Sequence, residues 1–183
     1  NFGNLSAGLM AYQMGLPVKA FVAACNENHP VPDYLSTGTY DPEPSVETIS
    51  NAMDVGSPSN FVRMQILAGG GLGEIKTLIK GYFTDDVQTK KRMSEVYMKS
   101  GYIMCPHTAV GYDGLLQYKN EYKQKVTGVV LSTAHYAKFL PTVEAVIGGK
   151  VPVPLRLSDL LHKQKKSILL GTDFEGFKKF LIG

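Results

Sequence analysis

The chain has 183 residues, of which 44% are apolar and 19% charged, and its formal net charge is +3. This composition is typical of a soluble globular protein that buries one core, and the dispersed basic residues argue against nucleic-acid binding. No apolar run approaches the ~20 residues needed to span a bilayer, so we expect no membrane segment.

The first residues predict a helix followed by a buried strand. Asn4 can cap a helix with its side-chain oxygen, residues 5–14 are rich in Ala, Leu, Met and Gln, and Gly15 can end the helix in the left-handed conformation. Residues 18–25 are almost continuously apolar, as expected for a strand that is covered on both faces. This order indicates a parallel α/β unit.

The middle of the chain combines a long loop with several helices. Residues 26–60 hold many prolines among Asn, Ser and Thr, which predicts an ordered loop with short helical turns. A helix that begins at residues 84–86 has a capping residue, acidic residues in its first turn and Gly101 after its end. We expect helices at residues 59–67, 73–80 and 84–99.

The rest of the chain predicts two more strands. Residues 102–105 are short and apolar, and residues 126–131 are β-branched, so both are expected to be strands. A helix is expected at 106–123, and short helices with loops at 140–183. Together these elements predict an α/β protein with three layers, αβα, in which helices cover both faces of a partial parallel sheet.

Polar residues collect in the loops that follow the predicted strands. These loops are residues 1–4, whose strand would lie upstream, 26–29, 105–108 and 132–138. In a parallel sheet the loops at the carboxyl ends of the strands share one edge, where ligands bind. We therefore expect them to meet at one crevice.

Several residues in these loops have both a chemical and a structural interpretation. Gly3 allows a tight turn and the approach of an anion such as phosphate to the following helix, but it also suits simple capping. The hydroxyl of Thr133 can form a hydrogen bond with a flat heterocycle or cap the helix after it. His107 and His135 are either acid/base groups or packed side chains. The spacing of Cys105 and His107 does not fit a familiar metal site.

The two cysteines, Cys25 and Cys105, both lie in apolar runs. Two cysteines do not make a disulfide framework, which favours the reducing cytoplasm. The chain begins with Asn rather than Met, and we expect it to be a piece of a longer polypeptide.

Several motifs, in their order and approximate spacing, resemble the threonine synthase family across nearly the whole chain. The most specific are SNAMDV at residues 50–55 and STAHYAKF at 132–139. The others are NFGNLSAGL at 1–9, LPVK at 16–19, AACN at 23–26 and PHTAVGY at 106–112.

This resemblance implies a pyridoxal-phosphate (PLP) enzyme of the tryptophan-synthase-β-like fold. Such enzymes convert O-phosphohomoserine and water to threonine and phosphate. The family's glycine-rich loop, which grips the cofactor phosphate, maps to Asn1, Phe2, Gly3 and Asn4. The threonine that faces the pyridine nitrogen maps to Thr133.

The resemblance also implies that residues 1–183 are one C-terminal segment of such an enzyme. The Schiff-base lysine of the family is expected upstream, so we expect no catalytic residue in this chain and no activity from it alone. Lys138 is not expected to replace that lysine. An exposed sheet edge would favour self-association. Candidate ligands for the substrate phosphate, by chemistry alone, are Asn26, Ser57, Asn60, Arg63 and Lys138.

Two alternatives remain open. The chain could belong to another PLP β-elimination enzyme of the same fold, although SNAMDV and STAHYAKF argue against this. It could also be a non-catalytic domain that keeps a PLP or phosphate pocket.

Overall fold

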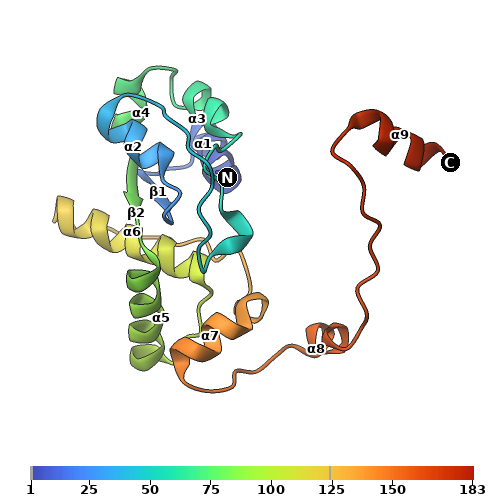
Figure 1. Cartoon of the computed structure of the whole chain (residues 1–183). Helices are drawn as coiled ribbons and strands as arrows, with labels where there is room; N and C mark the ends of the chain where they lie inside the picture. The colour runs from blue at the N-terminus through green and yellow to red at the C-terminus, as the bar shows by residue number, and fades with distance from the viewer. Residues whose placement is uncertain (1, 124) are drawn as a thin grey trace. The chain divides into compact units, whose positions relative to one another are not determined.

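The computed structural model describes residues 2–123 and 125–183 and divides into two compact units, Asn1–Val151 and Pro152–Gly183. None of the helices in these described ranges is long and apolar enough to cross a membrane. In chain order the elements are α1 (Gly3–Gln13), β1 (Phe21–Cys25), α2 (Pro30–Thr37), η1 (Asn51–Met53), α3 (Phe61–Leu67), α4 (Leu72–Leu78), β2 (Ile79–Phe83), α5 (Asp86–Ser100), α6 (Pro106–Tyr122), η2 (Tyr136–Phe139), α7 (Leu140–Ile147), α8 (Leu155–Leu161) and α9 (Phe174–Ile182) (Figure 1).

The two strands form a parallel sheet in the first unit. Phe21 pairs with Ile79, and the register continues to Cys25 and Phe83. Helix α6 packs against β1, and α2 packs against β2. Gly114 makes the first contact close, since a Cβ at this position would lie 2.8 Å from the Cβ of Ala24. The chain is therefore a mixed α/β protein with helices against both strands.

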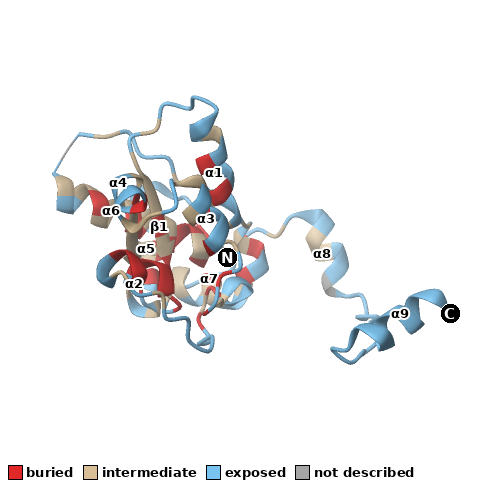
Figure 2. Cartoon of the chain, turned by 90° about the horizontal axis from the view of Figure 1, so that it is seen from above, coloured by how far each residue is buried: buried red, intermediate tan, exposed pale blue. Residues whose placement is uncertain are grey.

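Two hydrophobic clusters stabilise the first unit, and Figure 2 shows its buried residues. The first cluster joins α1, α2, α3 and α4 to the sheet, with Leu9, Met64 and Ile79 almost completely buried. The second joins α5, α6, η2 and α7 around Ala109 and Val143. In the second unit, by contrast, no residue of α9 is buried.

Most of the predicted helices are confirmed, together with the signals that end them. Gly15 and Gly101 follow α1 and α5 with φ angles of +102° and +71°. Asp85 caps α5 by accepting a hydrogen bond from the backbone N–H of Gln88. The short helices after residue 140 are present as α7, α8 and α9.

Five local predictions differ from the structure. The helix expected at 73–80 ends at Leu78, and the chain continues directly as β2. Residues 102–105 and the described residues of 126–131 are not strands, because no neighbouring strand in the described ranges pairs with them. The loop expected at 26–60 contains the eight-residue helix α2, which begins at Pro30. Asn4 does not cap α1, because the helix already begins at Gly3 and Phe2 occupies the N-cap position.

Candidate functional site

A polar cluster forms where the chain leaves β1. The side-chain amide nitrogen of Asn26 lies 3.0 Å from Thr48 Oγ1, 2.9 Å from Ser50 Oγ and 2.8 Å from Asp54 Oδ1. Thr48 donates its hydroxyl to Asp54 Oδ1 at 2.7 Å and its backbone N–H to Asp54 Oδ2 at 3.0 Å. These bonds attach the loop around residues 46–54 to the carboxyl end of the strand. Asn26 is thus engaged within the protein.

His107 lies beside this cluster, in the first turn of α6. Its ring is 4.9 Å from that of Phe139, between centroids. Burial lowers the pKa of His107, while the nearby Ser50 backbone and Asp54 carboxylate oppose this shift. The Ser50 backbone lies close enough to affect this pKa, but neither buried ring nitrogen has the geometry of a hydrogen bond with any described residue. The lowered pKa favours the neutral imidazole.

Such unused polar atoms are costly in a folded protein. A buried donor or acceptor without a partner costs about 1–3 kcal/mol. In the described part of the chain, the two nitrogens of His107 are the buried side-chain atoms in this condition. The buried ring nitrogens of His107 therefore receive no hydrogen bond from the part of the chain that the structure describes.

The loop with the STAH motif is attached to the same end of α6. The hydroxyls of Thr108 and Ser132 are 3.1 Å apart, and Thr108 Oγ1 lies 3.2 Å from the sulfur of Cys105. The next residue, Thr133, is exposed. The contact between Thr108 and Ser132 thus joins two of the four polar loops, 105–108 and 132–138, while Asn26 of a third loop bonds to Ser50 and Asp54, which lie near His107.

The structure decides between the two interpretations of some residues in this loop. The cap of η2 is His135, whose Nδ1 accepts a hydrogen bond from the backbone N–H of Ala137 at 3.1 Å. Thr133 is therefore not the cap, and its contact with a heterocycle stays a prediction. His135 has a structural bond, so the packed interpretation of this histidine is favoured. Lys138 is exposed on η2.

The opening turn is described from its second residue, so Asn1 lies outside the described residues. Phe2 packs against the first hydrophobic cluster, and Gly3 and Asn4 form the first turn of α1. A groove of about 420 Å³ runs from this turn between α1 and α3. It is lined by Gly3, Ser6, Ala7, Met10, Asn60, Arg63, Ile66 and Leu67.

The start of α1 fits a phosphate group. Gly3 is not crowded, since a Cβ there would make one ordinary contact, 3.8 Å from the Nδ2 atom of Asn60. The first turn of α1 holds no acidic residue, and a helix N-terminus favours an anion. Arg63 donates to Asn60 Oδ1 at 3.2 Å along the same groove. Of the other residues considered for a phosphate, Ser57 is exposed.

Sequence reasoning gave no role to Thr48, Ser50 or Asp54, which form the polar cluster with Asn26. The SNAMDV motif contains Ser50 and Asp54, so the sequence placed these two residues in a motif but did not indicate that they contact Asn26. Within the described ranges, no three His, Cys, Asp or Glu side chains are grouped so that they could hold a metal ion.

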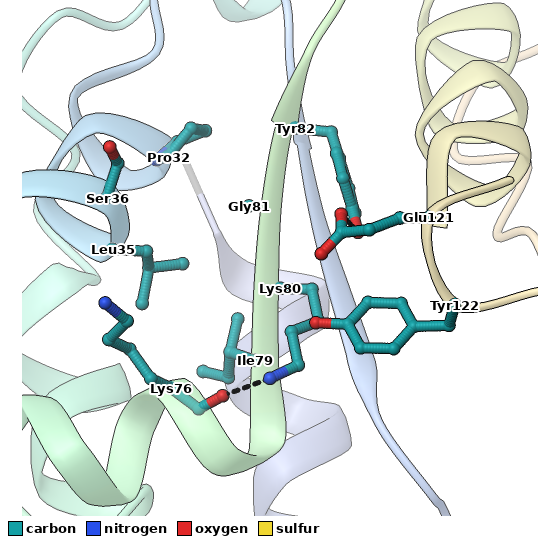
Figure 3. A pocket seen from close by; sticks show the side chains of 10 residues that line it. All are labelled: Pro32, Leu35, Ser36, Lys76, Ile79, Lys80, Gly81, Tyr82, Glu121 and Tyr122. Carbon is teal, nitrogen blue, oxygen red and sulfur yellow. Dashed lines mark hydrogen bonds between the residues drawn. The ribbon is translucent and has the colours of Figure 1, made fainter. Parts of the chain in front are cut away.

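A second hollow, of about 190 Å³, lies along β2 and away from these residues (Figure 3). Tyr82 donates its hydroxyl to Glu121 at 2.6 Å, and burial together with this bond raises the pKa of Tyr82. Lys80 donates to the backbone oxygen of Lys76 and lies 5.7 Å above the ring of Tyr122. Because these groups already pair with one another, we assign this hollow no chemistry.

Burial also excludes one potential nucleophile. Cys25, at the end of β1, is buried, and desolvation raises the pKa of its thiol to about 12. A thiol with such a pKa stays protonated near neutral pH and is unreactive.

Known proteins resemble this chain over its whole length. A family model described as "Threonine synthase, C-terminal" matches residues 108–181. The threonine synthase of Buchnera aphidicola subsp. Baizongia pistaciae is 41% identical over 182 residues, which cover 100% of this chain and 41% of that protein.

Solved structures agree with the sequence matches. The threonine synthase of Escherichia coli has 38% identity and a TM-score of 0.88, over 99% of this chain and 41% of that one. The PLP-bound threonine synthase of Brucella melitensis has 27% identity and a TM-score of 0.79, over 99% of this chain and 44% of that one. The chain is therefore related to the threonine synthases and spans about 41% of the length of the Buchnera aphidicola and Escherichia coli enzymes.

Proposed function

We propose that this chain is the C-terminal segment of a cytoplasmic, PLP-dependent threonine synthase, which converts O-phosphohomoserine and water to threonine and phosphate. The observation that carries the proposal is the match to a threonine synthase structure over 99% of the chain, with a TM-score of 0.88. In this proposal β1 and β2 belong to the parallel sheet of a tryptophan-synthase-β-like fold with three layers.

The opening turn would hold the cofactor phosphate through Asn1, Phe2, Gly3 and Asn4. The uncrowded position of Gly3 and the absence of acidic residues from the first turn of α1 support this role. The free N–H groups of a helix N-terminus suit a phosphate dianion. The phosphate would therefore be fixed mainly by backbone groups.

Thr133 would face the pyridine nitrogen with a neutral hydroxyl. A carboxylate at this position would hold the nitrogen protonated, whereas a hydroxyl leaves it largely unprotonated. When bound, PLP would supply the electron sink for phosphate elimination at the γ carbon and water addition at the β carbon. The exposed position of Thr133 leaves its hydroxyl accessible to a ligand.

The 183-residue chain alone is expected to be inactive, because covalent catalysis in the family uses a Schiff-base lysine that we place in the upstream half. Phosphate release from O-phosphohomoserine with added PLP measures this. Turnover, or a PLP adduct on this chain after borohydride reduction, would show that a lysine of the chain serves instead.

The phosphate assignment is tested by titrating the chain with PLP and following its absorbance. Gly3→Ala is expected to weaken binding by about tenfold or more, since the added methyl group occupies the space of the phosphate. The fold should persist, because this Cβ would make only an ordinary 3.8 Å contact.

Gly73→Ala is the matched control, since it also lies at the start of a helix and its Cβ would meet nothing within 4 Å. We expect Gly73→Ala to bind PLP like the wild type. If Gly3→Ala bound PLP as tightly as the wild type does, the assignment of the cofactor phosphate to this turn would be wrong. A wild-type chain that does not bind PLP would contradict the proposed function.

A further inference from the structure

His107 differs from the other described histidines of the first unit in having no hydrogen bond. His29 contacts Asp33 through Nδ1 at 2.8 Å, and His135 accepts from the backbone N–H of Ala137 at 3.1 Å. Each of these rings therefore contributes to local structure. The two buried nitrogens of His107 contribute no such bond.

The polar neighbours of His107 already bond to one another. Both oxygens of Asp54 accept hydrogen bonds from Thr48, and Oδ1 also accepts from Asn26. The hydroxyl of Ser50 lies 2.9 Å from the amide nitrogen of Asn26 and 3.0 Å from the hydroxyl of Thr48. These side chains thus bond to one another and not to the imidazole, which leaves the ring nitrogens of His107 available for a group from outside the chain.

The position of His107 points to an oxygen-rich ligand. The residue lies in the first turn of α6, whose N-cap, Cys105, makes no side-chain cap hydrogen bond. The adjacent Thr108 contacts Ser132, the residue before the predicted ring-nitrogen contact, Thr133. A neutral imidazole at this point can donate one N–H to an anionic oxygen without adding a charge of its own.

We propose that His107 is a ligand-binding residue, whose neutral imidazole donates a hydrogen bond to a phosphate or carboxylate oxygen of the bound small molecule. This inference rests on the proposed function, which offers two sources of such an oxygen: PLP and O-phosphohomoserine. The role is distinct from that of the opening turn, because His107 lies on another helix and is not among the residues of the α1–α3 groove.

The test compares His107→Phe with the wild-type chain in thermal unfolding, without ligand, with PLP, and with PLP plus O-phosphohomoserine. The phenyl ring can pack against Phe139 as the imidazole does, and it removes two unpaired polar atoms. We therefore expect the ligand-free Tm to stay the same or rise.

Ligand affinity should change in the opposite direction. A ligand that binds the folded state raises Tm, and we expect His107→Phe to lose most of this rise, as about a tenfold loss in affinity. Loss with PLP alone assigns the bond to the cofactor, whereas loss only after O-phosphohomoserine is added assigns it to the substrate. His107→Gln, which keeps an N–H donor, should recover part of the affinity.

His162→Phe is the control, since His162 is exposed at the end of α8 in the second unit. It should leave both ligand responses unchanged. If His107→Phe showed the same rise in Tm on ligand addition as the wild type, this inference alone would be overturned. The same holds if the ligand-free Tm fell by several degrees while that rise stayed the same. A wild-type chain stabilised by neither ligand would overturn the proposed function and this inference together.

NMR of the ¹⁵N-labelled histidine rings gives a measurement on the wild type that does not depend on how His107→Phe folds. The ring nitrogens of His107 are expected to have the shifts of a neutral imidazole and to move when the ligand is added. Ring signals that stay fixed while the ligand binds would overturn the inference.

Discussion

Asp113 and His107 lie on the same helix, α6, and both carry buried polar atoms, but only Asp113 is saturated with partners. Arg92 donates to Asp113 Oδ1 through Nε at 2.8 Å and Nη2 at 2.6 Å. Thr84 and Gln117 donate to Oδ2 at 3.0 Å and 2.9 Å. Neither ring nitrogen of His107 has a partner within the described residues.

The contrast shows in the effect of burial on each pKa. Burial alone would raise the pKa of Asp113, but the hydrogen bonds from Arg92, Gln117 and Thr84 hold it below its usual value. For His107, burial lowers the pKa, and the opposing influence of the Ser50 backbone and the Asp54 carboxylate is too small to reverse the shift. The middle of α6 therefore stabilises the fold through Asp113, whereas its first turn bears a cost at His107 that a ligand could remove.

The strongest test of this comparison is Asp113→Ala. It leaves the Arg92 guanidinium, whose side chain is 18% exposed, without its buried partner. Removing one member of a buried ion pair costs about 3–5 kcal/mol. We expect a loss of this size in the free energy of unfolding, measured from urea denaturation midpoints.

Asp41→Ala is the control for Asp113→Ala, because Asp41 lies exposed in a loop. Its free energy of unfolding should change by less than about 0.5 kcal/mol. A similarly small loss for Asp113→Ala would mean that the donors around this carboxylate bond to water instead, and the contrast between Asp113 and His107 would fail.

The sequence predicts the helices that carry both residues, because their boundaries depend on local signals. Asp85 caps α5 through a residue three positions away, and Pro106 is the first residue of α6. Strand β2 could not be predicted in this way. It contains Lys80 and Gly81, which weaken the strand pattern, and it depends on pairing with β1, far upstream.

The same limit applies to the candidate site. The sequence predicted that polar loops follow the strands and meet. The contact between Thr108 and Ser132 joins two of the four loops, and Asn26 of a third bonds to Ser50 and Asp54, which lie near His107. The sequence did not predict that Asp54, Thr48 and Ser50 would form a hydrogen-bonded cluster with Asn26, because these partners are 22 to 28 positions away and follow no period. The unpaired state of His107 is likewise visible only in three dimensions.

Acid should affect the two groups in separate pH ranges. The folded-state pKa of His107 is below its ordinary 6.5, so the unfolded chain takes up a proton at a higher pH than the folded chain does. The free energy of unfolding therefore falls as the pH drops from about 6.5 towards the folded-state pKa. The folded-state pKa of Asp113 is below its ordinary 3.8, so its contribution is present above 3.8 and is lost as the pH falls through the folded-state value. Each single proton gives a slope of at most about 1.4 kcal/mol per pH unit.

These effects can be separated by measuring the free energy of unfolding of the wild type and two variants in urea. The measurements cover a range of about 4 pH units, from pH 7 to pH 3. His107→Phe should remove the decline that begins near 6.5, and Asp113→Asn should reduce the decline that begins below 3.8. If His107→Phe keeps the full upper decline, the buried imidazole is not its source.

The smallest expected effect comes from Glu95, which shares Arg92 with Asp113. Both carboxylates lie 2.6 Å from a guanidinium nitrogen, so distance alone would give the two pairs equal strength. Their exposure differs, however, since the side chain of Glu95 is 47% exposed and that of Asp113 only 3%. Water screens the exposed pair, which limits such pairs to about 0–1 kcal/mol. We therefore expect Glu95→Ala to lower the free energy of unfolding by less than about 1 kcal/mol in urea denaturation. A loss as large as that of Asp113→Ala would show that distance to the shared guanidinium, and not burial, sets the strength of both pairs.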